Sequence, residues 1–298
     1  MESRLSSRLL RAGILAAGVG LTSVPLAGQA PRAAPQPGDC PREPVGFHAC
    51  ALAKAKIFTP PRTSDGKPDM QGIWRGQTGG VENIEAHPGN GDVAAGPTFV
   101  VDPADGKIPY QPWAMAQRRE NVEKYLDPNV ACLSSGVPRM LYTPGDLEII
   151  QSPGIVAITH SRSHTFRVMP TTPVPPISKS VPLWLGSSQG RWDGNTLVVD
   201  VTNQNGKTWF DQAGNFDTDA VHIVERFTMI DRDTIHYEAR IDDPTVYTRA
   251  WTMAFAIRRV KEPGYEVFEE ACHEGERDTE HLLSTGLRVY PGVTRNLR

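Results

Sequence analysis

From about residue 145 onward, hydrophobic and polar residues alternate along the chain with a period of two. This period is typical of strands that bury one face, because successive side chains of a strand point to opposite sides of the sheet. The stretches that fit are predicted as strands: Leu147–Ile150, Ile155–His160, Thr165–Met169, Trp184–Ser188, Thr196–Thr202, Val221–Ile230, Thr234–Ile241, Trp251–Ile257 and Tyr265–Cys272.

Most of these strands are separated by short turns. Asp193-Gly194-Asn195 is a hairpin signal, because Gly and Asn tolerate the backbone angles of tight turns, and Asp231-Arg232-Asp233 closes a second hairpin. Strands joined by short turns pair antiparallel. The sequence therefore predicts an all-β fold, in which an antiparallel meander closes into a barrel or sandwich.

Residues 47–145 are predicted to be the loop-rich and helical part of a single mainly β domain that spans 47–298. An amphipathic helix is expected near 111–126, where Pro112 suits the first turn and the chain ends the helix before Asp127-Pro128. Its expected apolar face is Trp113, Ala116, Val122, Tyr125 and Leu126. A shorter helix is expected in the Ala- and Lys-rich stretch from His48 to Ile57.

In one predicted hairpin an acidic residue interrupts an apolar row. The residues that share the inward face are Val221, Ile223, Phe227 and Met229 on one strand and Ile235, Tyr237, Ala239 and Ile241 on the other, and Glu225 stands among them. A buried carboxylate is either desolvated, which raises its pKa, or neutralised by a partner. The opposite face should be solvated, because it carries His222, Arg226, His236, Glu238, Arg240 and Asp242.

Residues 1–30 have the pattern of a signal peptide. Three Arg precede a short apolar run, Ala12–Leu26, which ends in Ala27-Gly28-Gln29-Ala30. An uncleaved anchor helix is the alternative. The Pro-rich stretch 31–46 is predicted to be a linker, and the protein is expected to be periplasmic or secreted, with no stable membrane span after cleavage.

The charge balance excludes one class of partner. The 298 residues include 31 Lys and Arg against 34 Asp and Glu, a net charge of −3, so no basic excess exists to displace counterions from nucleic acid. The length and the 39% of hydrophobic residues are enough for a full-sized core. The sequence does not determine the oligomeric state.

Four cysteines lie beyond the signal peptide, an even number that favours two disulfides in an exported chain. Cys40 with Cys50 is the natural local pair, which leaves Cys132 with Cys272, although four cysteines allow three pairings. A zinc site is the alternative, but no Cys-x-x-Cys or closely spaced Cys and His cluster supports it. No metal and no cofactor is expected.

Five motifs occur in order: Ile108-Pro109-Tyr110-Gln111-Pro112-Trp113-Ala114, Cys132-Leu133-Ser134-Ser135-Gly136-Val137-Pro138-Arg139, Gly190 to Asp200, His222-Ile223-Val224-Glu225-Arg226-Phe227 and Ile241 to Thr248. Together they resemble a family of exported bacterial proteins without an established function, over roughly residues 57–275. The resemblance implies an exported domain and transfers no mechanism.

The chain departs from that family at one place. Relatives carry Pro-His-Ser before the His-x-x-Glu-Arg stretch, whereas this chain has Asn215-Phe216-Asp217-Thr218. Any chemical role of the family His is lost or replaced here. A weaker likeness is the Gly72-Ile73-Trp74 opening before a strand meander, which resembles lipocalin-like barrels but is a common tripeptide.

Glu225 is the leading candidate for chemistry, because a buried carboxyl with a raised pKa can carry a proton. His222 is a second acid or base candidate, but three positions along a regular strand place it on the opposite face. Arg139 is expected to be a charge partner or an anion clamp. A structural carboxylate, bonded to Arg139, Arg226 or Tyr237, is the alternative interpretation of Glu225.

The remaining candidates are ligand-binding residues: Trp209, Asp211, His160, Arg162, Tyr237 and Tyr247. Trp209 with Phe210 is the expected exposed aromatic pair, because it follows a loop. His160 and Arg162 are expected on one face with His164, Ile158, Phe166 and Val168. His160 and His164 are poor joint metal ligands, since residues four apart on a strand are separated by about 13 Å.

These features predict an exported, cofactor-independent lyase or hydrolase that acts on a small phenolic or carbohydrate-derived molecule. Glu225 would carry the proton and Trp209 would stack on the ligand. The alternative is a non-catalytic periplasmic protein that binds an apolar ligand or haem in the same cavity.

Overall fold

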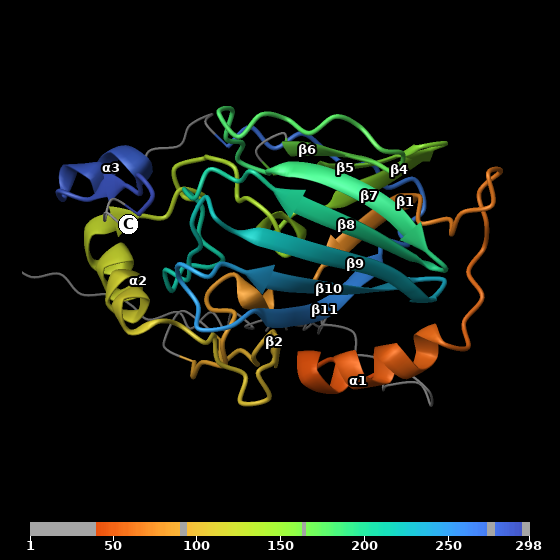
Figure 1. Ribbon diagram of the computed structural model, residues 1–298, viewed down its shortest axis with the longest axis horizontal. Coiled ribbons are helices and arrows are strands. Elements are labelled where there is room, and N and C mark those ends of the chain that lie inside the picture. The colour runs from red at the N-terminus through yellow and green to blue at the C-terminus, as the bar shows by residue number, and fades with distance from the viewer. Residues whose placement is uncertain (1–39, 90–93, 163–164, 273–277, 294–298) are drawn as a thin grey trace, which may run out of the picture. The chain divides into compact units, whose positions relative to one another are not determined.

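The computed structural model describes residues 40–89, 94–162, 165–272 and 278–293 (Figure 1). The predicted signal peptide and residues 31–39 of the predicted linker lie outside the described residues. Within the described ranges, no helix combines the length and the hydrophobicity needed to cross a membrane.

The described chain is dominated by one antiparallel sheet, as the alternating pattern predicted. Its strands are β1 (Gly72–Gly76), β2 (Val100–Asp102), β4 (Leu147–Ser152), β5 (Ile155–His160), β6 (Thr165–Pro170), β7 (Ser187–Asp193), β8 (Thr196–Thr202), β9 (His222–Asp231), β10 (Thr234–Asp242) and β11 (Trp251–Arg259). They are ordered β6-β5-β4-β1-β11-β10-β9-β8-β7, with β2 paired to β11. The sheet curls into a nearly closed barrel (Figure 1).

The barrel has a seam between its first and last strands. Each of the nine strands on the path is antiparallel to the next, so the two edge strands β6 and β7 run in the same direction. A hairpin cannot join parallel neighbours. Residues 171–186, called here the crossover, therefore return along the seam from the end of β6 to the start of β7.

Side-chain bonds hold the seam where strand pairing does not. Gln189 on β7 donates from Nε2 to the carbonyl oxygen of Pro170 on β6 at 3.0 Å. Arg167 on β6 donates from Nε to Oγ of Ser188 on β7 at 2.9 Å. The two edge strands lie side by side in Figure 1. Side chains thus bridge the seam of the nearly closed barrel, and within the described residues β6 and β7 form no ladder of backbone hydrogen bonds.

Both predicted hairpins are confirmed. Asp193 pairs with Thr196 and Asp231 pairs with Thr234, so each turn has two residues, and Gly194 takes a positive φ of 59°. The predicted inward rows of β9 and β10 are also confirmed. Every residue in them, Glu225 included, is at most 3% exposed.

Two predicted strands are displaced or absent. The strand expected at Trp184–Ser188 begins at Ser187, because Trp184 and Leu185 belong to the crossover. Residues 265–272 form no strand and make one isolated bridge, from Glu270 to Arg162. Period-two alternation reports one-sided burial, which an irregular segment lying on a surface also has.

Three helices accompany the sheet among the described residues: α1 (Pro44–Ala55), α2 (Pro112–Lys124) and α3 (Asp278–Ser284). Single-turn helices occupy Thr78–Gly80 and Arg139–Leu141, and β3 (Tyr125–Leu126) pairs in parallel with β12 (Arg288–Val289). The expected helix near 111–126 is confirmed as α2. Of the expected apolar row, Trp113 and Tyr125 pack against the core and Leu126 is buried, whereas Ala116 and Val122 are exposed.

The buried face of α2 is largely polar: it consists of Ala114, Gln117 and Asn121, whereas Val122 is 51% exposed. Gln117 donates to Asn121 at 3.0 Å, and Asn121 Nδ2 donates to the carbonyl oxygen of Gly214 at 3.1 Å. These bonds satisfy the buried amides, so hydrogen bonds dock the helix together with the apolar contacts of Trp113 and Ala114.

Helix α1 starts inside the stretch predicted as linker. Glu43 caps it by accepting hydrogen bonds from the backbone N–H groups of Val45 and Gly46, both at 2.8 Å, and Pro44 suits the first turn. Phe47 and Ala51 pack on the outer face of the barrel in a small cluster that includes Ile230 and Ala256. The linker prediction was therefore wrong from Pro44 onward.

Both expected disulfides are present, Cys40–Cys50 beside α1 and Cys132–Cys272 between the middle and the end of the chain. The docking of α1 overturns one expectation. His236, predicted to face water on the outer side of β10, is only 3% exposed because α1 covers it.

Candidate functional site

Glu225 lies inside the barrel and is completely buried. Arg167 donates from both terminal nitrogens to its two carboxylate oxygens, and the Nη1–Oε1 distance is 3.0 Å. Tyr237 Oη donates to Oε1 at 2.7 Å. The carboxylate is therefore a neutralised, hydrogen-bonded ion pair, one of the two states that its sequence position predicted.

The arginine beside Glu225 is Arg167, and neither Arg139 nor Arg226 takes this place. The register of the β5–β6 hairpin sets this choice, because Ile158 is opposite Arg167 and both point inward. Phe166 and Val168 therefore point outward, at 70% and 47% exposure. The expected shared face of His160 with Phe166 and Val168 was wrong, since the turn shifts the alternation by one residue.

Arg139 makes a different buried pair. Its terminal nitrogens donate to both oxygens of Asp127 at 2.8 and 2.6 Å, and Nη1 also reaches the carbonyl oxygen of Trp209 at 3.3 Å. The expected role of Arg139 as partner of Glu225 was wrong. Asp127 follows β3, which comes directly after α2, so this pair ties the chain just beyond that helix to the short helix at Arg139–Leu141.

His222 lies on the outer face of β9, on the side opposite Glu225 as its position predicted. Its Nε2 is 3.2 Å from Oδ1 of Asp200, and its side chain is 45% exposed. Arg226 lies on the same face and pairs with Asp193 at 3.3 Å. His222 and Glu225 therefore cannot act on one bound molecule.

The expectation that Trp209 and Phe210 are exposed was wrong. They are 3% and 2% exposed, because Tyr290 from the last described segment packs on Trp209 with ring centres 5.4 Å apart. Asp211 is buried and accepts from the backbone N–H of Ile84 at 2.8 Å. Burial raises the pKa of Asp211 to about 6.

Tyr237 and Tyr247 are also buried in the core. Tyr237 bonds Glu225, and Tyr247 Oη donates to the carbonyl oxygen of Phe216 at 2.7 Å. Burial raises the pKa of both phenols well above the usual value. These tyrosines hold neighbouring segments of the interior together.

His160 and Arg162 do not form a joint binding face. His160 is 5% exposed, and its Nδ1 accepts from the backbone N–H of Arg162 at 3.0 Å. Burial lowers the pKa of His160 to about 4. The Arg162 guanidinium instead pairs with Glu270 at 3.2 Å, which fastens a later segment against this end of β5.

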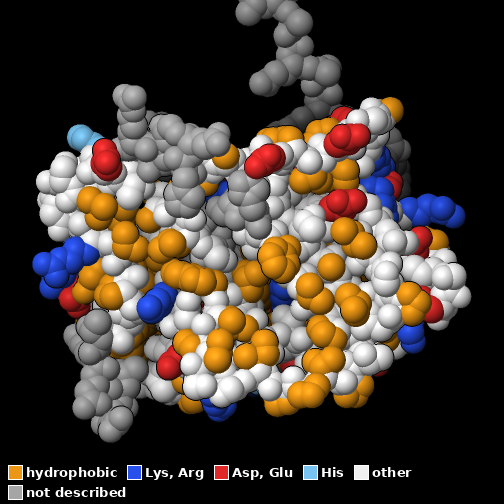
Figure 2. Space-filling view, turned by 90° about the horizontal axis from the view of Figure 1, so that it is seen from above, with side chains coloured by type: hydrophobic (Ala, Val, Ile, Leu, Met, Phe, Trp, Pro, Cys, Tyr) orange, Lys and Arg blue, Asp and Glu red, His pale blue; other side chains and the backbone are white. Residues whose placement is uncertain are grey.

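The seam of the barrel carries a groove of about 400 Å³. We call it the seam groove, and its lining residues are Ser134, Thr165, Phe166, Arg167, Val168, Leu183, Trp184, Leu185, Gly186 and Ser188. Most of these come from β6 and from the crossover. Seen from above, the same face of the molecule carries many hydrophobic side chains (Figure 2). Sequence reasoning missed this groove, because it depends on which strands lie at the seam.

The polar part of the groove is joined to the interior. Ser188 Oγ accepts from Arg167, whose other nitrogens donate to Glu225. The accepting role of Ser188 Oγ leaves its own O–H available as a donor. The groove thus combines aromatic walls with one hydroxyl donor, Ser188, which is hydrogen-bonded to the Arg167–Glu225 ion pair.

A second group of buried polar atoms lies elsewhere in the interior. Within the described residues, both carboxylate oxygens of Asp217 lack a hydrogen-bond partner, as do Nε1 of Trp209, Nε1 of Trp251 and Oη of Tyr290. Burial, and then the nearby Asp243 carboxylate, raise the pKa of Asp217 well above its usual value. Among the described residues, Asp217 is therefore a buried carboxyl without a hydrogen-bond partner.

An Asp217→Asn variant is expected to keep its stability better than the parent protein as pH rises. A carboxyl whose pKa is raised by folding adds to the free energy of unfolding. This contribution is fully present below the unfolded pKa of about 3.9 and is lost as pH rises through the folded pKa. Asn does not ionise, so the stability of the variant should change less with pH. Melting temperatures measured from about pH 4 to about pH 8 test this expectation.

Asp219→Asn is the matched control, because Asp219 is exposed two positions away. If the melting temperatures of the two variants and the parent protein change with pH in parallel, folding does not raise the pKa of Asp217.

No protein-family model, no curated protein and no solved structure matches the chain. The resemblance noted from the motifs therefore stays a prediction.

Proposed function

We propose that the protein binds a small, uncharged aromatic molecule that carries an oxygen acceptor, such as a phenol or an aryl carbonyl. The observation that supports this most is the seam groove, where Phe166 and Trp184 line a space of about 400 Å³ beside Ser188. Aromatic walls with one or two placed polar groups are typical of small-molecule sites. The binding role corresponds to the non-catalytic alternative drawn from the sequence.

The charge in the groove argues for an uncharged ligand. Arg167 is the cation of the lining, but its nitrogens already bond both oxygens of Glu225 and the hydroxyl of Ser188. A ligand carboxylate would compete with Glu225 for this guanidinium, and Glu225 would then be a buried unpaired charge. A phenol or carbonyl oxygen can accept from the Ser188 O–H without disturbing the pair.

The lyase or hydrolase hypothesis stays a prediction. It needs Glu225 to exchange a proton, and both of its oxygens accept hydrogen bonds from Arg167 or Tyr237 while the side chain is completely buried. A base must come within hydrogen-bond reach of the substrate. The geometry of Glu225 therefore favours binding over acid and base catalysis. Haem as the ligand also stays a prediction.

The expected compartment is part of the proposal. Two disulfides, Cys40–Cys50 and Cys132–Cys272, form and persist in oxidising surroundings such as the periplasm or the extracellular medium. We infer that the protein binds its ligand there.

The binding proposal is tested by titrating phenol, cresol and acetophenone while following tryptophan fluorescence. Trp184 lies in the groove, so the parent protein should respond and Trp184→Phe should lose most of the response. Ser188→Ala should weaken binding about 2- to 10-fold, the usual effect of one neutral hydrogen bond.

Ser64→Ala serves as the control, because Ser64 is exposed and lines a different pocket. Benzoate is the charged comparison and should bind more weakly than acetophenone. The proposal fails if none of the neutral aromatics binds, or if Ser64→Ala and Ser188→Ala weaken binding equally.

A further inference from the structure

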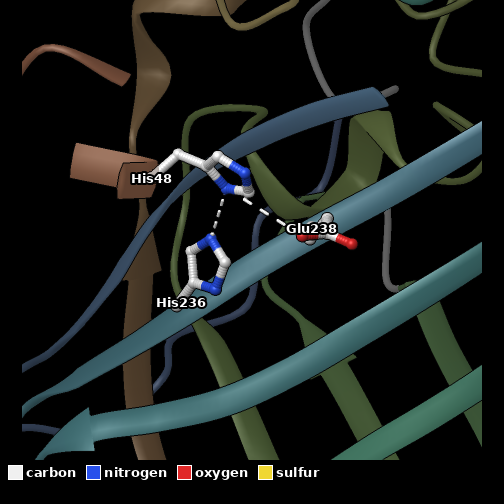
Figure 3. Close-up of side chains that lie close together, drawn as sticks. All are labelled: His48, His236 and Glu238. Carbon is white, nitrogen blue, oxygen red and sulfur yellow. Dashed lines mark hydrogen bonds and ion pairs between the residues drawn. The ribbon is translucent and has the colours of Figure 1, made fainter. Parts of the chain in front are cut away.

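A group of three metal-binding side chains lies outside the barrel, under α1 (Figure 3). His236 and Glu238 are two positions apart on β10, so both project from its outer face. His48 comes from α1, and its Nδ1 is 3.0 Å from Nε2 of His236 and 3.9 Å from Oε2 of Glu238. In the described residues, this is the one group of three or more His, Cys, Asp or Glu with such spacing.

The spacing of the three ligand atoms suits a single transition-metal ion. All three lie within 4.8 Å of one another. Ligands bound to zinc at about 2.0 to 2.1 Å in a tetrahedron are about 3.3 Å apart, so the distances between the three ligand atoms must change by a few tenths of an ångström to about 1.5 Å to complete the site. Two imidazoles and one carboxylate are a donor set that zinc accepts with a fourth position left open.

The three side chains differ in how far they are exposed to solvent. His236 is only 3% exposed, whereas the side chains of His48 and Glu238 are 21% and 22% exposed. The open coordination position of a bound ion would therefore face solvent. Arg226 is opposite Glu238 on β9, but its guanidinium pairs with Asp193 at 3.3 Å, which reduces its repulsion of a cation.

The position of His48 is set by the packing of apolar residues of α1 on the barrel. Phe47 and Ala51 are buried against Ile230 and Ala256, and the Cys40–Cys50 disulfide ties the middle of α1 to the chain that precedes it. A ligand held by a rigid support loses little freedom when the ion binds. The sequence predicted no metal, because His48 and His236 are 188 residues apart and no short motif joins them.

We propose that His48, His236 and Glu238 bind one zinc ion, with a solvent molecule as the fourth ligand, and that the ion fastens α1 to β10. The ion replaces the His48–His236 hydrogen bond with two metal bonds. The site lies on the outer face of the barrel and is independent of the seam groove.

The test is a zinc titration of the tag-free protein, freed of metal by a chelator, against a chromophoric zinc indicator. The parent protein should take up one zinc per chain, and its melting temperature should rise with zinc. His48→Ala and Glu238→Gln should each weaken binding more than about 100-fold, since even changes beyond the direct ligands cost 10- to 100-fold. Cobalt in place of zinc should give the visible absorption of a tetrahedral site.

His222→Ala is the matched control, because His222 also lies on the outer face beside a carboxylate, Asp200, but has one imidazole only. It should bind zinc like the parent protein. His48 is partly exposed on a surface helix, so His48→Ala should fold, as circular dichroism would verify. The proposal is overturned if the parent protein takes up no zinc, or if His48→Ala binds zinc as tightly as the parent protein does.

Discussion

Replacing Arg167 by Met is expected to lower the free energy of unfolding by about 3 to 5 kcal/mol. The change removes the cation that faces Glu225, and Glu225 is completely buried with Tyr237 as its other partner. Leaving a carboxylate in the core without its counter-charge costs far more than losing a surface pair. Urea unfolding at neutral pH, followed by circular dichroism, measures the effect.

Two further variants separate the buried charge from other causes. Adding Glu225→Gln to Arg167→Met should recover much of the loss, because Gln is uncharged and can still accept from Tyr237. Arg226→Met removes an exposed arginine from its pair with Asp193 and should change stability by less than about 1 kcal/mol. If Arg167→Met costs no more than Arg226→Met, the pair with Glu225 does not support the barrel.

Removing the Cys132–Cys272 disulfide by changing both residues to Ser is expected to lower the free energy of unfolding by about 5 kcal/mol. The two cysteines are 140 residues apart, so the bond restricts the unfolded chain over a long loop. In the folded protein the bond also holds the segment that follows β11 against the loop after β3. Urea unfolding without reductant measures the change.

The Cys40–Cys50 disulfide provides the comparison within the same chain. Its cysteines are 10 residues apart, so replacing both by Ser should cost about 3 kcal/mol. The expected difference between the two double variants is thus about 2 kcal/mol. Equal losses would mean that strain or local packing, rather than the length of the closed loop, determines the contribution of each bond.

The sequence predicted well which residues of one strand are buried, but it did not predict the contacts between strands that are distant in the chain. The burial of Glu225 followed from its place in an apolar row, since alternate side chains of a strand point to the same face and that face is the core. Tyr237 on the next strand was predicted as a partner, because a hairpin brings adjacent strands together. Arg167 was missed, since it belongs to a strand that reaches Glu225 only across the seam.

The aromatic and metal candidates show the same division. Trp209 follows a loop, which suggested exposure, but Tyr290 from the end of the chain covers it. His236 belongs to a row of polar residues, which suggested a solvated face, but α1 covers it from the start of the chain. Burial by an element distant in sequence leaves no mark on the local pattern.

The sequence by itself determined the strands β8 to β11, the turns between β7 and β8 and between β9 and β10, the helix at Pro112–Lys124 and the inward position of Glu225. These features depend on residues within one or two strand lengths, whose alternation and turn chemistry act locally. Only the tertiary structure decided which arginine neutralises Glu225, where the seam and its groove lie, and how His48 meets His236. Those outcomes require segments far apart in the chain to dock, and docking depends on the shape of the whole barrel.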